Sequence, residues 1–62
     1  MNINLITASI VMSSVEDRTS VDRHLLIDDP DFIGLFKSLL NANELDMAQM
    51  TDSLSDYVSN HY

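Results

Sequence analysis

Cysteine is absent from this 62-residue sequence, and glycine and proline occur only once each. Without cysteine the chain can form neither a disulfide nor a cysteine-based metal cluster. A chain of this length lies near the lower limit for folding alone, and natural chains of this size that lack such cross-links often gain stability by oligomerising. We therefore expect a single small domain, residues 1–62, that associates with itself or with a larger partner.

Basic side chains are also scarce. Arg18, Arg23 and Lys37 stand against ten acidic residues, which gives a formal net charge of −7. Binding to nucleic acid depends on cations that neutralise phosphates, and anionic membrane surfaces attract basic segments in the same way. We therefore expect a protein partner or a homo-oligomer, with no direct nucleic acid binding and no membrane association.

A long hydrophobic run is missing as well. The apolar stretch of residues 3–12 is interrupted by Asn4, Thr7 and Ser9. It is shorter than the roughly 20 residues that a membrane-spanning helix needs. No lysine or arginine precedes Arg18, so the stretch lacks the positively charged start of a signal peptide. The sequence predicts a soluble, cytoplasmic protein.

The clearest helix follows the only proline. Asp29 can accept hydrogen bonds from the first helical turn, and Pro30 suits the first helical position because an N–H there would have no partner. Apolar residues then cover an arc of roughly 160° around the helix. They are Phe32, Ile33, Leu35, Phe36, Leu39 and Leu40. The pattern predicts a helix over residues 30–42, with a wider apolar face than one neighbouring helix covers.

A second helix is predicted over residues 44–59, with Asn43 as its N-cap. One face of it is apolar and carries Met47, Met50, Leu54, Tyr57 and Val58. The acidic face opposite carries Glu44, Asp52 and Asp56. Because the connection between the two helices is so short, we expect them to pack as an antiparallel αα-hairpin.

Residues 3–12 fit two patterns. A helical seam with alternating spacings of four and three is formed by Met1, Leu5, Ala8, Met12 and Val15. The β-branched content equally suits a strand, which would have to pair with a second copy of the chain. We favour the helix and interpret residues 1–12 as an apolar N-terminal arm.

Residues 13–27 are poorly amphipathic. The segment from Ser13 to Glu16 matches a capping box that would start a helix at Ser14, and residues 19–22 equally fit the start of a shorter helix. The predicted fold class is therefore all-α: a small helical domain built on the hairpin of residues 30–59, with a helical N-terminal arm as the third layer.

No pattern of residues points to catalysis or to a metal site. A calcium loop that began at Asp29 would need oxygen ligands at Ile33 and Leu40, which are aliphatic. His24 and His61 have no neighbours that complete a set of metal ligands, and no serine lies in a nucleophile motif. So short a chain also leaves little room for an enclosed pocket of several hundred Å³. We expect no enzyme activity and no cofactor.

The short turn between two helices is typical of DNA-binding helix-turn-helix domains, and a strand followed by two helices would be typical of ribbon-helix-helix dimers. Recognition elements in both classes contact bases and phosphates with basic or amide side chains. Here the second helix offers only Gln49 among acids. The charge therefore argues against both classes.

The function that the sequence favours is protein–protein interaction by a small regulatory or accessory protein. It would dock an apolar helical face on a partner or on itself, because large apolar and aromatic side chains dominate such contacts. The predicted contact residues are Phe32, Phe36, Leu39, Met50, Leu54 and Tyr57. The alternative is an acidic inhibitor that occupies the nucleic-acid-binding site of a DNA- or RNA-handling protein.

Overall fold

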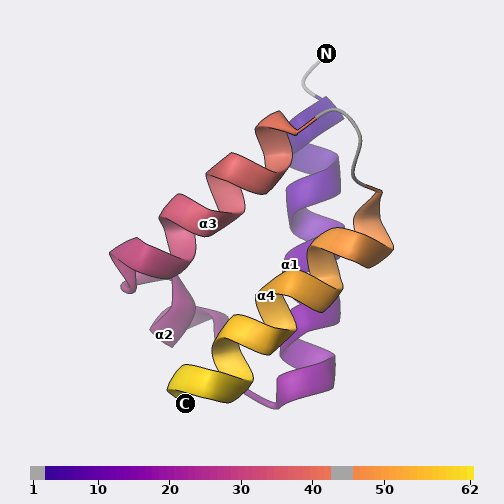
Figure 1. Cartoon of the computed structure of the whole chain (residues 1–62). Coiled ribbons are helices and arrows are strands. Elements are labelled where there is room, and N and C mark those ends of the chain that lie inside the picture. The colour runs from indigo at the N-terminus through magenta and orange to yellow at the C-terminus, as the bar shows by residue number, and fades with distance from the viewer. Residues whose placement is uncertain (1–2, 43–45) are drawn as a thin grey trace.

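The computed structural model describes residues 3–42 and 46–62, with side chains from Leu5 onward. Within these residues the chain forms only helices: α1 (Ile3–Thr19), α2 (Arg23–Ile27), α3 (Pro30–Asn41) and α4 (Met47–His61) (Figure 1). No strand occurs in the described part of the chain. The all-α prediction is confirmed, and so is the helix rather than the strand over residues 3–12.

The helices surround one core. Helix α3 rises away from α2, and α4 runs in the opposite direction toward the C-terminus, while α1 lies behind both (Figure 1). Helices α3 and α4 contact each other, but the most extensive packing is between α1 and α4. Helix α1, which includes most of the predicted N-terminal arm, therefore packs against the hairpin mainly through α4.

Helix α3 begins as the sequence predicts. The Asp29 side chain accepts hydrogen bonds from the backbone N–H groups of Asp31 and Phe32, at 3.0 and 3.2 Å, and Pro30 occupies the first turn. Ala42 is the C-cap, so the helix ends one residue before the predicted boundary. Capping and proline geometry together fix this start.

Helix α4 begins later than predicted. Its N-cap is Asp46, whose backbone is extended, and the predicted cap Asn43 lies outside the described residues. The Gln49 N–H donates to Asp46 Oδ1 at 2.8 Å, and the Asp46 N–H donates back to Gln49 Oε1 at 3.0 Å. This reciprocal capping box satisfies two backbone donors at once, which favours a start at Met47 over a start at residue 44.

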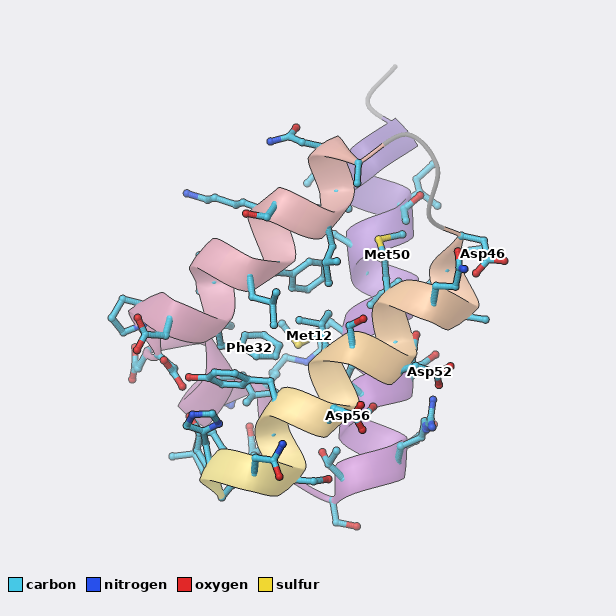
Figure 2. The ribbon with its side chains drawn as sticks, viewed as in Figure 1. Met12, Phe32, Asp46, Met50, Asp52 and Asp56 are labelled. Atoms are coloured by element: carbon cyan, nitrogen blue, oxygen red, sulfur yellow. The ribbon has the colours of Figure 1, made fainter. Side chains whose placement is uncertain are left out.

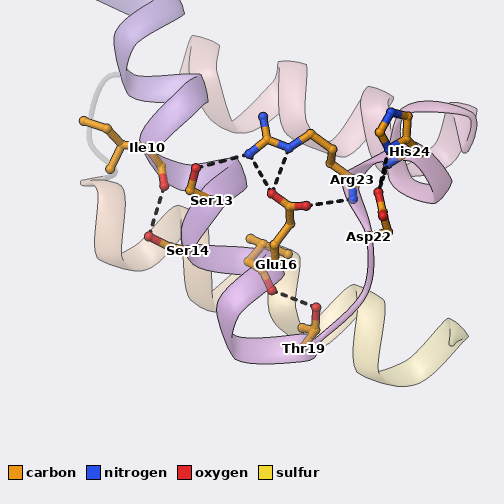
Figure 3. Close-up of polar contacts among 9 residues, drawn as sticks. Ile10, Ser13, Ser14, Glu16, Thr19, Asp22, Arg23 and His24 are labelled. Atoms are coloured by element: carbon orange, nitrogen blue, oxygen red, sulfur yellow. Dashed lines mark hydrogen bonds and ion pairs between the residues drawn. The ribbon is translucent and has the colours of Figure 1, made fainter.

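Helix α1 continues through the predicted start at Ser14, so that boundary is wrong. The Ser14 hydroxyl donates to the Ile10 carbonyl at 3.0 Å and is satisfied inside the helix (Figure 3). The helix ends at Thr19, and the next residue, Ser20, has a left-handed φ of 59° and an N–H that donates to the Glu16 carbonyl. A separate short helix, α2, then starts after Asp22, close to the alternative start at residues 19–22.

The core draws side chains from all four helices. Its buried members are Val11, Met12, Val15, Leu26, Phe32, Phe36, Met50, Leu54 and Val58. Phe32 is fully buried and meets Phe36 edge-on, with ring centroids 5.9 Å apart, and Tyr57 at 6.0 Å. Figure 2 shows Phe32, Met12 and Met50 pointing into the space between the helices. This cluster supplies the apolar burial that holds the small chain together.

Candidate functional site

The contact residues predicted from the sequence lie mainly inside the core. Phe32, Phe36, Met50 and Leu54 are buried, and Leu39 and Tyr57 are half-buried and pack against them. The structure brings all six together, but around the interior of the chain rather than on an open surface. In this conformation the four buried residues offer a partner little or no area. Their spacing on α3 and α4 is explained by the fold itself.

The largest exposed apolar side chains of α1 lie on its N-terminal half. Leu5, Ile6 and Ile10 are 68%, 54% and 47% exposed, and we call them the α1 apolar face. Exposed Ser9 and Ser13 lie beside them on neighbouring turns. No residue from 1 to 15 carries a charged side chain, so this face is surrounded by no acid of its own helix before Glu16.

An open apolar hollow of about 180 Å³ lies between α1 and α3. It is lined by Ala8, Ile33, Phe36, Lys37 and Leu40. Leu5 lies three residues before Ala8, so the two side chains occupy adjacent turns of the same helix. The hollow is therefore next to the α1 apolar face, and the wide apolar arc of α3 is not completely covered here.

A second pair of exposed apolar residues lies on α2. Leu25 and Ile27 are 57% and 54% exposed. They differ from the α1 apolar face in their surroundings, because Asp22 and Asp28 stand on either side of them in the short helix and its caps. Any acidic surface that approached this pair would meet like charges.

The acidic face of α4 is partly engaged within the chain. Asp52 is exposed and forms an ion pair with Arg18 at 2.5 Å, and Asp56 is exposed on the same helix (Figure 2). Glu44 lies outside the described residues. An exposed ion pair of this kind contributes little to stability, but it holds the end of α1 against α4.

A second ion pair joins the end of α1 to the start of α2. Glu16 accepts hydrogen bonds from the Arg23 guanidinium at 2.8 Å and from the Arg23 backbone N–H at 3.0 Å, and Arg23 also donates to Ser13 Oγ (Figure 3). The side-chain and backbone hydrogen bonds lower the pKa of the Glu16 carboxyl, and the side-chain hydrogen bond and the charge of Glu16 raise the pKa of Arg23. One carboxylate thus fixes the turn between the two helices.

Asp29 ties α3 to the end of α4. Its Oδ1 caps α3, while its Oδ2 accepts hydrogen bonds from the hydroxyls of Tyr57 at 2.8 Å and Tyr62 at 2.9 Å. Burial raises the pKa of the Asp29 carboxyl, but these tyrosine and backbone hydrogen bonds outweigh it, and the pKa lies below its ordinary value of 3.8. Burial and the Asp29 contact raise the pKa of Tyr57 to about 12.

The two histidines have structural partners. His24 Nδ1 lies 2.8 Å from Asp22 Oδ1, and the His61 ring stacks on Tyr57 with a centroid distance of 4.1 Å. No group of three or more possible metal ligands is present among residues 3–42 and 46–62. In the same part of the chain, no helix has the length and apolarity needed to cross a membrane.

Sequence reasoning missed the α1 apolar face. The predicted seam included Leu5, which is exposed, and omitted Val11, which is fully buried. A signal was available, because Ile6 and Ile10 fall outside the predicted seam and make the N-terminal half of α1 apolar on more than one side. A helix of that kind needs more cover than one chain of this size provides.

No protein-family model, curated protein or solved structure matches this chain. Functional inference therefore depends on the chemistry and geometry of its own residues.

Proposed function

We propose that this chain is a small acidic protein–protein interaction module, a regulatory or accessory protein that docks an apolar helical face on a partner or on itself. The observation that carries the proposal is the exposure of Leu5, Ile6 and Ile10 on an uncharged part of α1. Large apolar side chains on adjacent turns gain free energy when another surface removes them from water.

The proposed contact surface thus moves from α3 and α4 to α1. Substitution of the buried Phe36 or Met50 by alanine would weaken the core before it weakened any contact with a partner. The residues of the α1 apolar face can be changed with little effect on the core, because roughly half or more of each side chain is already in water. They are the proper positions at which to test docking.

The acidic inhibitor receives less support from the arrangement of charges. A surface that imitates nucleic acid needs many free carboxylates in a regular array, because phosphates are evenly spaced along the strand. Here Asp52 is paired with Arg18, Glu16 with Arg23, and Asp29 is bound by two tyrosines. In the proposed module the net charge of −7 instead increases the association rate with basic partner surfaces.

Affinity capture with matched double variants tests the proposal. Immobilised wild-type chain, Ile6→Lys/Ile10→Lys and the control Leu25→Lys/Ile27→Lys would be incubated with lysate of the source cell. The two variants add equal charge at pairs of similar exposure on different helices. We expect that some proteins are retained by wild type and by the control but are lost from the α1 variant. Retention of the same proteins by all three would contradict docking through α1.

The acidic alternative has its own variant. Asp52→Lys/Asp56→Lys should leave the captured proteins bound if apolar contacts dominate, since both carboxylates lie on α4 and Asp52 pairs with Arg18 at the opposite end of α1 from the apolar face. Loss of binding on this change, together with steep dissociation by salt, would favour the inhibitor instead.

A further inference from the structure

We draw no further inference here: the strongest candidate, the open hollow between α1 and α3 beside the exposed side chains of the α1 apolar face, is an apolar surface, and nothing in the described part of the structure shows what covers it.

Discussion

The two ends of α1 differ in the side chains they carry and in the contacts these side chains make. At its C-terminal end Glu16 binds Arg23 and Arg18 binds Asp52, so charged groups are joined to neighbouring helices. At its N-terminal end Leu5, Ile6 and Ile10 are exposed to solvent, with no charged side chain beside them on the helix. The comparison indicates that polar contacts join one end of α1 to neighbouring helices, whereas the other end leaves large apolar side chains exposed to solvent.

The polar end extends beyond α1. Asp29 caps α3 and accepts the hydroxyls of Tyr57 and Tyr62, so the start of α3 and the end of α4 meet at one carboxylate. Figure 1 shows that α2, the start of α3 and the C-terminus gather at this end of the molecule. A chain with so small a core therefore uses hydrogen bonds to fix helix ends where apolar contacts are few.

The largest expected change in stability comes from a substitution in the buried core, which lies between the two ends of α1. Phe32→Ala removes a fully buried ring that contacts Phe36 and Tyr57. A loss of about 3–5 kcal/mol is expected from such a cavity, which is comparable with the whole stability of so small a domain. Urea unfolding followed by circular dichroism should find the variant largely unfolded. Leu5→Ala is the control and should change the unfolding free energy far less, since Leu5 is exposed.

The second prediction tests whether the polar end depends on Asp29. Asp29→Asn weakens the cap and both tyrosine contacts. The control Asp31→Asn changes an exposed neighbour whose side chain forms no hydrogen bond or ion pair within the described part of the chain. The midpoint of thermal unfolding should fall for Asp29→Asn and stay nearly constant for Asp31→Asn. Equal midpoints for the two variants would show that the carboxylate does not hold α3 to α4.

The pH dependence of stability gives a third test, with opposite signs for the two partners. Because the pKa of Asp29 is lowered, its contribution is present above the ordinary value of 3.8 and is lost as the pH falls below it. Because the pKa of Tyr57 is raised from 10.0 to about 12, its contribution is present below 10.0 and is lost as the pH rises toward 12. Tyr57→Phe should reduce the alkaline loss in thermal unfolding curves, and part of the loss should remain because the hydrogen bond to Asp29 also raises the pKa of Tyr62.

The hairpin helices could be predicted because their signals are local. Asp29 and Pro30 define the start of α3, and the apolar residues of α4 share one face, so both elements follow from short spacings. The start of α4 was misplaced because Asn43 and Asp46 are both good caps, and only Asp46 has a Gln49 three residues later to complete the box. The predicted start at Ser14 failed because its hydroxyl can bond within a helix as well as begin one.

The candidate site was harder to predict because it depends on which helix covers which. The spacing of Phe36 and Met50 is the same whether a partner or α1 covers them, and the sequence does not specify that α1 packs along α4. Once α1 takes that position, these residues become core and the uncovered apolar surface moves to Ile6 and Ile10. Tertiary packing, rather than local pattern, decides between the two surfaces.

A fourth prediction concerns a buried hydroxyl on α4. Ser55 is buried on α4, and its hydroxyl has no hydrogen-bond partner within residues 3–42 and 46–62. Ser55→Ala should raise the free energy of unfolding by about 1 kcal/mol, because it removes an unsatisfied buried hydroxyl and favours the helix. The control is Ser53→Ala, an exposed change on the same helix, which isolates the gain from helix propensity alone. Urea unfolding should rank Ser55→Ala above both wild type and the control.

The smallest change in unfolding free energy is expected from a substitution in the α1 apolar face. The dependence of the thermal midpoint on protein concentration then tests the difference between the two ends of α1. Ile6→Ser exchanges residues of similar helix propensity at a position that is 54% exposed, so the unfolding free energy of the monomer should change by no more than about 0.5 kcal/mol. Docking of the chain on itself, one form of the proposed function, would stabilise the folded state by mass action, so the thermal midpoint of wild type should then rise with protein concentration and that of Ile6→Ser should rise less. A variant that is strongly destabilised even in dilute solution would show that this end belongs to the core, and the contrast between the two ends of α1 would disappear.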